Sequence, residues 1–279
     1  MYLSVIISTY NQPKWLEKVL YGYDIQTYKN FELIIADDGS GKETELLIEQ
    51  LKSKVSYPIK HVWHPDDGFR KCTILNKAIL NSSGTYLVFS DGDCIPRADF
   101  LQTHIDFHEP GYFLSGGMYR LNMDVSHKIT LKEILSQQCF SIPYLRSIGQ
   151  ERRRLKDLKL SLKNPKQIAL MNSITPTNAS WNGHNSSGWK EDILLVRGFD
   201  ERMKYGGEDR ELGERLFNNG IKSKQIRYSA ICIHLEHKRG YVTEEDWNRN
   251  YKIRKETRKE RRKFTTYGIQ LPIESKKQD

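Results

Sequence analysis

The fold is decided by the stretch LSVIIS at residues 3–8, near the start of the chain. Its apolar residues follow one another instead of alternating with polar ones, which is typical of a strand buried on both faces of a parallel sheet. Such sheets occur in α/β proteins, where a helix crosses back over the sheet between parallel strands. Working outward from residues 3–8, we expect strand and helix patterns that follow in turn.

Three further strand patterns lie within the first 110 residues, at 31–36, 59–63 and 85–90. Between them, apolar residues recur at the three- and four-residue spacing of helices. Repeated strand–helix units with short loops predict a right-handed, mostly parallel α/β sheet with helices on both faces. The pattern is interrupted by a charged, helix-prone segment at 146–166, which we expect to be an excursion over the active-site face or a mobile segment. It resumes with a late strand at 229–234.

The amino-acid composition limits the classes of protein to which this chain can belong. Hydrophobic residues make up 38% of the 279 residues, which is ordinary for a globular protein. The sequence holds no run of 18 apolar residues, so we expect no membrane span, and we expect the mature chain to start with the strand near residue 2 instead of a signal peptide. The four cysteines show no CxxC pairing or disulfide-like spacing, so we expect them to be reduced and the protein to be cytoplasmic.

The net charge of +9 is concentrated at the end of the chain. Residues 238–279 hold 13 Lys or Arg against 7 Asp or Glu, and 249–263 alone hold nine basic residues and two acidic ones. One interpretation is a solvated basic helix. The other is attraction to an anionic membrane surface or a phosphorylated acceptor, at about 1 kcal/mol for each cation near such a surface. Nucleic acid is not expected as a partner, because the candidate site described next is acidic.

Polar residues follow three of the predicted strands. They are Ser8 with Tyr10, then Asp37 with Asp38, then Asp91 with Gly92 and Asp93. Ligands of open α/β sheets bind at the carboxyl ends of the strands. Alternation places the two carboxylates of the Asp-Gly-Asp motif on one side, and Gly92 lets the backbone approach a ligand. Paired carboxylates suit a hard divalent cation, Mg²⁺ or Mn²⁺.

Three other motifs have both a structural and a functional interpretation. Asp38 can belong to a turn and helix cap, or can bind a uracil base. Glu208 and Asp209, after two glycines, can stabilise a helix N-terminus, or can act as a base held against a substrate. His234, with His237 three residues later, can be structural or can be a neutral third ligand of the ion.

The order of these motifs resembles the large family 2 of inverting GT-A glycosyltransferases. The residues that carry the resemblance are Val5 to Asn11, Asp37 to Ser40 and Asp91 to Asp93. The second half, from Gly198 through Tyr205-Gly206-Gly207-Glu208-Asp209 to His234, is similar to the galactosyltransferase-type part of bacterial chondroitin polymerases and beta-1,4-galactosyltransferases. Together the matches cover about residues 2 to 240.

The resemblance implies a GT-A domain at 1–240 and a basic helical extension at 241–279. Within the domain, 1–110 would be the nucleotide-binding half and 111–240 the acceptor and catalytic half. The nucleotide would be bound by Ser8, Tyr10, Asp38, Phe69, Arg70, Lys71, Asn76 and Asp91. Tyr10 would pack on the base, the two cations would face the diphosphate, and Asp91 would approach the ribose or the metal.

The remaining roles follow from the same resemblance. Asp93 and His234 would bind Mn²⁺ or Mg²⁺, with His237 as the alternative ligand. Asp209 would be the general base, with Glu208 beside it. The acceptor or the donor sugar would be contacted by Tyr205, Gly206, Gly207 and Asn185. Tyr205 stands where beta-1,4-galactosyltransferases have Trp, so their acceptor preference does not carry over.

The expected reaction is inverting, metal-assisted transfer of a hexose or N-acetylhexosamine from a UDP-sugar. The acceptor would be a glycan or lipid-linked saccharide in bacterial surface polysaccharide synthesis, reached from the inner face of the membrane through the basic C-terminus. The alternatives are a nucleotide-sugar or carbohydrate-binding protein without turnover and a nucleotidyltransferase. The latter would need an early Gly-rich phosphate loop, which residues 8–11 do not supply.

Overall fold

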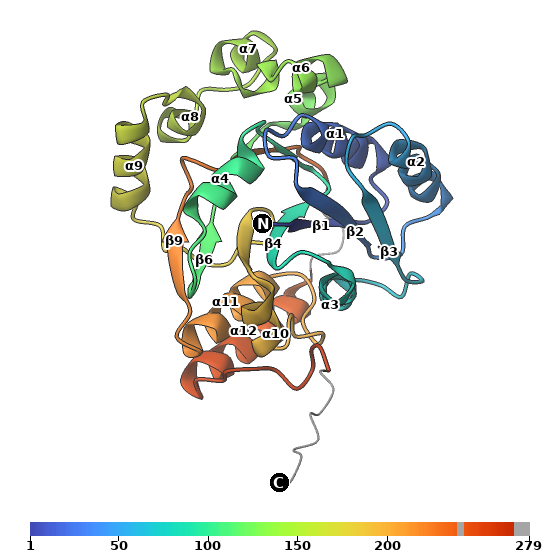
Figure 1. Ribbon diagram of the computed structural model, residues 1–279, viewed down its shortest axis with the longest axis vertical. Helices are drawn as coiled ribbons and strands as arrows, with labels where there is room; N and C mark the ends of the chain where they lie inside the picture. Colours follow the sequence, from blue (N-terminus) through green and yellow to red (C-terminus); the bar gives the residue numbers. More distant parts are fainter. Residues whose placement is uncertain (239–242, 271–279) are drawn as a thin grey trace.

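The computed structural model describes residues 1–238 and 243–270. Its first half alternates strands and helices, which confirms the strand pattern read from the sequence (Figure 1). The elements are β1 (Leu3–Thr9), α1 (Pro13–Asp24), β2 (Phe31–Asp37), α2 (Lys42–Lys52), β3 (Ile59–Trp63), α3 (Lys71–Asn81), β4 (Tyr86–Asp91), β5 (Cys94–Pro96) and α4 (Phe100–Phe107).

The second half is less regular and mostly helical. Its elements are β6 (Tyr112–Ser115), β7 (Gly117–Arg120), α5 (Met123–Lys128), α6 (Leu131–Leu135), the 3-10 helix η1 (Gln138–Phe140), α7 (Ile142–Ser147), α8 (Arg154–Ser161), α9 (Pro165–Ile174), β8 (Ser186–Trp189), α10 (Lys190–Leu195), α11 (Glu208–Asn218), β9 (Lys222–Gln225), β10 (Ile231–His234) and α12 (Glu244–Lys259).

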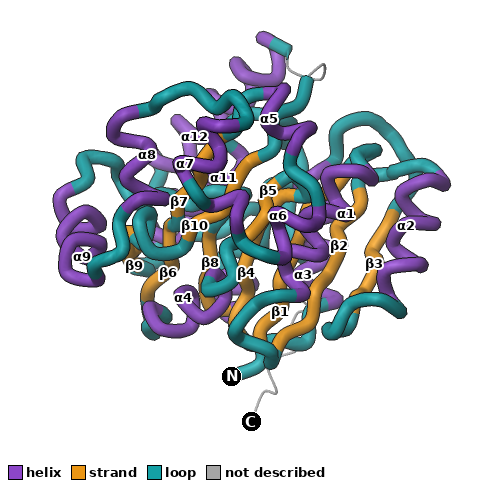
Figure 2. The backbone as a smooth tube through the Cα atoms, turned by 90° about the horizontal axis from the view of Figure 1, so that it is seen from above, coloured by secondary structure: helices purple, strands orange, loops and turns teal. Residues whose placement is uncertain are grey.

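Seven strands form the central sheet in the order β3-β2-β1-β4-β8-β6-β9, which Figure 2 shows from above. The pairs among β1 to β4 are parallel, whereas β8 runs antiparallel to both β4 and β6. The register sets Ser8 of β1 beside Asp91 of β4 and Thr9 beside Asp37 of β2. Polar residues that are far apart in the sequence therefore meet at one edge of the sheet.

Both faces of this sheet are buried, because alternate residues of each central strand enter different cores. Val5 and Ile7 of β1 pack with α1 and α2, whereas Ile6 packs with α3, α10 and α11 on the other face. All three side chains are fully buried. Burial of each such side chain stabilises the fold by about 1.5–3 kcal/mol relative to its exposed state. Because helices cover both faces of the sheet, every residue of the strand faces a core, which explains the unbroken apolar run.

A second, three-stranded sheet has the order β5-β10-β7. In it β10 pairs antiparallel with β5, so that His234 lies opposite Cys94. The N–H of Leu235 donates to the carbonyl of Asp93, 2.8 Å away. This small sheet thereby brings the end of the late strand to the Asp-Gly-Asp motif.

Helices α5 to α9 form an arc along one side of the molecule (Figure 1). The segment 146–166 lies within this arc and includes α8. The Asp157 carboxylate accepts hydrogen bonds from the Tyr119 hydroxyl of β7 and from Arg146, both at 2.8 Å. These contacts hold α8 against β7.

The basic helix α12 packs against α11 (Figure 1). Ile253 of α12 and Ile269 beyond it belong to the same buried cluster as α3 and α11. The described part of the predicted extension therefore shares a core with the preceding residues, and its last residues, 271–279, lie outside the described part. All four cysteines are buried and free. Among the described residues, no helix has both the length and the apolarity to cross a membrane.

Candidate active site

Asp91 ends β4 and points into a polar cluster at the carboxyl edge of the sheet. Its Oδ1 atom accepts hydrogen bonds from the Ser8 hydroxyl at 2.7 Å and from Lys71 Nζ at 2.9 Å. Burial alone would raise the pKa of this carboxyl, but Lys71 and Ser8 hold it well below its usual range. Asp91 is therefore a carboxylate under all ordinary conditions.

Lys71 is the first residue of α3 and connects two groups of acidic residues. Burial would lower the pKa of its amine, but Asp91, Asp209 and Glu208 together raise it well above its usual value. The ammonium is thus fixed in its charged form between the Asp-Gly-Asp motif and the Gly-Gly-Glu-Asp motif. Asp91 and Glu208 are 117 residues apart in the chain, and only the fold places both near one cation.

Asp93 forms a compact group with both candidate histidines. His237 Nε2 lies 2.8 Å from Asp93 Oδ2, and His234 Nε2 lies 3.4 Å from the same oxygen. Ligand atoms of all three residues lie within 4.8 Å of one another. Burial would raise the pKa of Asp93, yet the hydrogen bond from His237 and the nearby His234 lower it. One carboxylate and two imidazoles at this spacing fit a divalent cation.

Asp209 stands at the start of α11, where Gly206 and Gly207 both have left-handed backbone angles, with φ of +112° and +92°. The Gly206 N–H donates to Glu208 Oε2 at 2.8 Å, so Glu208 braces the turn. Burial and the neighbouring Glu208 raise the pKa of Asp209 to about 7. Its Oδ1 atom is buried and has no hydrogen-bond partner in the part of the chain that the structure describes. An unpartnered oxygen on a carboxyl with this pKa is suited to accept a proton.

The turn before Asp209 is held from outside by α12. The Asn250 amide nitrogen lies 2.9 Å from the Lys204 carbonyl, 3.2 Å from that of Tyr205 and 3.1 Å from that of Gly206. The Trp247 ring covers Gly206 so closely that a Cβ there would lie 2.9 Å from it. Glycine is thus required at position 206 both by its φ angle and by the indole above it.

Aromatic rings line the approach to this turn. The Tyr205 ring makes edge-to-face contacts with Phe69 at 6.1 Å and with Trp247 at 6.4 Å between centroids. Phe69 precedes α3, whereas Tyr205 precedes α11. The contact brings the predicted nucleotide segment and the predicted acceptor residue side by side.

Asp38 lies one residue beyond β2 and is buried. Its carboxylate accepts hydrogen bonds from His64 Nε2 at 2.8 Å and from the Arg70 N–H at 2.9 Å. Burial raises its pKa above the usual value despite these partners. Tyr10, in contrast, is 44% exposed, and its hydroxyl donates to Asp66 at 2.8 Å. Asp38 also acts electrostatically on the Tyr10 hydroxyl, so the exposed ring and the buried carboxylate lie near each other at this edge of the sheet.

Two of the predicted site residues use their side chains to hold the fold together instead of facing the candidate site. Asn76 is buried in α3, where its amide bonds the backbone of Phe199 and the carboxylate of Glu201. Asn185 is fully buried between the sheets, where its amide bonds the carbonyls of Gly117 and Ala230 and the ring of His104. All their side-chain polar atoms are used within the protein. We therefore assign both a structural role, because neither presents a polar atom to a ligand.

The structure adds residues that the sequence analysis passed over. His184, beside Asn185, lies near Asp91 and Asp93, and burial lowers its pKa to about 4, so that it is neutral. His64 contacts Asp38, and Trp247 and Asn250 contact the turn before Asp209. His184 could have been found from the sequence, because it stands next to Asn185, which was already a predicted site residue. Nothing in the local sequence of α12 distinguishes Trp247, which is exposed, or Asn250, which is fully buried, from other residues of that helix.

A model of the glycosyl transferase family 2 matches residues 4–174, which is more than half of the chain. The chain belongs to glycosyltransferase family 2. This family 2 member is 29% identical to the chondroitin synthase of Escherichia coli over 246 residues, which are 84% of this chain and 34% of that protein. It is 27% identical to validoxylamine A glucosyltransferase of Streptomyces hygroscopicus, over 81% of this chain and 54% of the relative. The chain thus spans about a third to a half of these relatives.

Solved structures resemble this glycosyltransferase in fold. Residues 1–349 of Staphylococcus aureus TarS in complex with UDP-GlcNAc have a TM-score of 0.57 at 16% identity, covering 91% of this chain and 64% of that one. The mannosyltransferase PcManGT from Pyrobaculum calidifontis, in complex with GDP-Man and Mn²⁺, has a TM-score of 0.56 at 16% identity, covering 86% and 58%. These likenesses confirm the GT-A fold.

Proposed function

We propose that this family 2 glycosyltransferase transfers a hexose or N-acetylhexosamine from a UDP-sugar to a saccharide or lipid-linked acceptor, with inversion at the anomeric carbon. The observation that carries the proposal is the unpartnered Asp209 Oδ1 on a carboxyl whose pKa is about 7, linked through Lys71 to Asp91 at the metal-type cluster. A proton acceptor and a diphosphate-binding edge at one site are what direct displacement needs.

The donor half of the proposal rests on the edge formed by β1, β2 and β4. Asp38 would accept the N–H of the uracil ring, and the exposed face of Tyr10 would stack on it. The half-exposed Arg70 and the Lys71 ammonium would face the diphosphate, since cations at a strand edge attract phosphate. TarS, solved with UDP-GlcNAc, supports a uridine donor, whereas PcManGT, solved with GDP-Man, makes guanosine the alternative base.

Asp93, His234 and His237 would hold a divalent cation, Mn²⁺ or Mg²⁺. When bound, the ion neutralises the departing nucleoside diphosphate. Two imidazoles in the donor set favour Mn²⁺ over Mg²⁺, because Mg²⁺ prefers an all-oxygen shell. Both histidines contact the same Asp93 oxygen. We therefore assign both to the ion, instead of His234 alone.

Asp209 would take the proton of the acceptor hydroxyl as that oxygen bonds to the anomeric carbon. The bond from the anomeric carbon to the diphosphate breaks on the opposite side, and the diphosphate leaves with the electron pair. Lys71 holds Asp91 ionised and offsets the negative charge of Glu208 and Asp209. The Tyr205 ring, packed between Phe69 and Trp247, would form a wall of the acceptor pocket.

A panel of nucleotide sugars with Mn²⁺, scored for hydrolysis and for thermal stabilisation, tests the proposal. We expect one UDP-sugar to be hydrolysed slowly in the absence of acceptor and to raise the melting temperature. Indifference to every UDP compound would refute the assignment of Asp38. Stabilisation without hydrolysis or transfer would favour a binding protein, and release of pyrophosphate from a nucleoside triphosphate would favour a nucleotidyltransferase.

Membrane contact during bacterial surface polysaccharide synthesis, on the cytoplasmic side, is the final part of the proposal. Basic residues of α12 such as Lys252, Lys255 and Lys259 are exposed and form no ion pair among the described residues. They would attract an anionic lipid surface. Co-sedimentation with phosphatidylglycerol vesicles, but not with phosphatidylcholine vesicles, is the expected result, and equal recovery with both would refute it.

A further inference from the structure

A cavity lies beside the candidate active site, along the face of α11 that carries Arg210, Glu214 and Phe217. Its volume is about 590 Å³, within the range of small-molecule sites. It is bounded by α11, by α12 and by the segment 177–180. The residues that decide its chemistry are Arg210, Glu214, Phe217, Arg254, Arg258 and Asn178.

The cavity lies beside the site of Asp209, because Arg254 lines the cavity and also packs against Gly207 in the turn before Asp209. Gly213, in its lining, follows Asp209 by four residues on α11 and therefore lies on the same side of the helix, about 6 Å further along. The segment 177–183, which faces α11, also links the two places. Gly183 contacts the Asp209 carboxylate, Trp181 contacts Gly213, and the segment 177–180 lines the cavity. An extended acceptor that runs from Asp209 past the Gly206-Gly207 turn would reach Arg254 and the cavity behind it.

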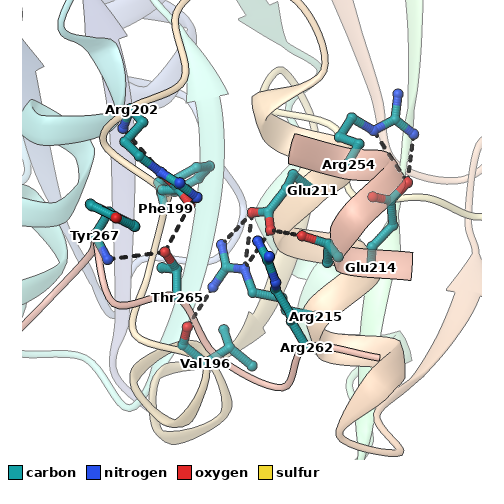
Figure 3. Close-up of polar contacts among 12 residues, drawn as sticks. Val196, Phe199, Arg202, Glu211, Glu214, Arg215, Arg254, Arg262, Thr265 and Tyr267 are labelled. Carbon is teal, nitrogen blue, oxygen red and sulfur yellow. Dashed lines mark hydrogen bonds and ion pairs between the residues drawn. The ribbon is translucent and has the colours of Figure 1, made fainter. Parts of the chain in front are cut away.

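The charge of the lining is positive. Arg254 Nη2 lies 2.6 Å from Glu214 Oε1, and Arg258 Nη1 lies 3.7 Å from the same oxygen (Figure 3 shows the first pair). One carboxylate thus faces two guanidinium groups. Arg210 is exposed and has no ion-pair partner within residues 1–238 and 243–270. Three arginines against one glutamate leave two positive charges, and guanidinium groups bind carboxylate or phosphate through paired hydrogen bonds.

The other lining groups suit a sugar more than a bare anion. Glu214 Oε2 is buried and has no hydrogen-bond partner in the described part of the chain, so it is available to accept from a hydroxyl or an amide N–H. Asn178 and neighbouring hydroxyl side chains offer further polar contacts. Phe217, 45% exposed, presents an apolar ring of the kind that packs on the C–H face of a pyranose.

We propose that this cavity is an acceptor subsite for an acidic saccharide, one that carries a carboxylate or a phosphate. The inference rests on the proposed function, since it takes Asp209 as the point where the acceptor is activated. The acidic group would lie between Arg210 and Arg258, one or more sugar units away from the hydroxyl that receives the donor sugar.

The test compares three hexameric probes for binding to the full chain by calorimetry at fixed salt. They are a hexasaccharide of alternating glucuronic acid and N-acetylglucosamine, a neutral N-acetylglucosamine hexasaccharide and a glycerol phosphate hexamer. We expect one or both acidic probes to bind about tenfold or more tightly than the neutral one. Tighter binding of the first acidic probe identifies a carboxylate, and tighter binding of the last identifies a phosphate. Equal binding of all three would overturn the proposal.

The double variant Arg210→Ala/Arg258→Ala should abolish the preference for the acidic probe while changing affinity for the neutral one less than about twofold. The matched control Lys255→Ala/Lys259→Ala removes two exposed charges of α12 that do not line the cavity, and it should keep the preference. Equal losses in both doubles would mean unspecific attraction and would overturn the proposal. The single variant Arg210→Ala, at an exposed residue, serves if the double variant does not fold.

UDP-sugar hydrolysis without acceptor separates this proposal from the preceding one. The double variant should hydrolyse the donor as the wild type does, because neither arginine is placed at the donor site. If no nucleotide sugar is hydrolysed at all, the proposed function fails whatever the probes do. If hydrolysis proceeds but the acidic preference is absent, only the acceptor subsite fails.

Discussion

The Nζ atom of Lys71 lies 2.9 Å from Oδ1 of Asp91, and this ion pair is where the two halves of the candidate active site meet. The same ammonium interacts electrostatically with Asp209 and Glu208. Without it, these three carboxylates would lose the cation that they share. Its position at the start of α3 makes the pairing a property of the fold instead of a flexible surface contact.

Replacing this cation should disable the enzyme. We expect Lys71→Met to lower the transfer rate by about 100-fold or more, because removal of one fixed charge or donor from a catalytic site costs of that order. Steady-state transfer with the donor identified by the panel measures the loss. Lys52→Met, at the exposed end of α2, is the control. A Lys71→Met enzyme of wild-type activity would show that the ammonium has no part in transfer.

Asp209→Asn should abolish transfer and spare the nucleotide. The amide cannot take a proton from the acceptor hydroxyl, so turnover should fall by roughly 10²–10⁴-fold. Titration with UDP in the presence of Mn²⁺ should give a dissociation constant within about twofold of wild type, since no donor contact is assigned to this residue. Asp106→Asn, at an exposed residue of α4, is a matched carboxylate-to-amide control and should keep the wild-type transfer rate. Transfer at the wild-type rate would remove Asp209 as the base.

The raised pKa of Asp209 predicts an activity profile. Its ionised form is the proton acceptor, so transfer should rise as pH increases through about 7 and level off above it. Rates measured from pH 5.5 to 9 with a donor that titrates outside this range test the profile. A rate independent of pH between 6 and 8 would contradict the assignment.

The same pKa predicts a stability difference. The pKa of Asp209 is about 7 in the folded protein, against an ordinary value of 3.8 for an aspartate in an unfolded chain. The folded form therefore keeps its proton longer, and stability is lost as pH rises from about 4 to 7. Asp209→Asn has no such loss. At pH 8 the variant should melt higher than wild type, by roughly 5 °C, with a smaller gap at pH 4.5. A lower melting temperature at pH 8 would contradict the burial of an ionisable Asp209.

The metal assignment predicts three equivalent losses. Mn²⁺ affinity, measured by the electron paramagnetic resonance of the free ion, should fall at least about tenfold in Asp93→Asn, His234→Ala and His237→Ala. Removing the ion with a chelator should stop donor hydrolysis, and Mn²⁺ should restore it. His127→Ala, at an exposed histidine, is the control. Unchanged Mn²⁺ affinity in His237→Ala would show that His234 is the single histidine ligand of the ion.

Asn250 should act as a positioning residue. Its amide bonds three carbonyls of the turn that carries Asp209, so Asn250→Ala should lower kcat about tenfold with little change in the KM for the donor. Asn250→Gln tests whether a longer amide partly restores the rate. A lower melting temperature together with a raised KM for the donor would instead indicate that Asn250→Ala destabilises the whole fold.

Much of this site was predictable because strands carry their own signature. Ser8, Asp38 and Asp91 each follow an apolar run that only a buried strand explains, and parallel strands align their carboxyl ends. The pairing of Asp93 with a late histidine was also predictable from the strand pattern before His234. That both histidines contact Asp93 was not, because the path of the chain at β10 depends on its pairing with β5 and β7.

The sequence by itself determined the succession of strands and helices in the first half, the edge at which the acidic residues gather and the candidate base. Tertiary structure alone decided that one cation, Lys71, interacts with both Asp91 and Asp209, that Asn76 and Asn185 are structural, and that α12 holds the turn before Asp209. The physical reason is the distance along the chain over which each effect acts. Burial pattern and turn chemistry act between neighbouring residues, whereas pKa shifts, buried amide contacts and cavities arise between segments that approach each other only in the folded chain.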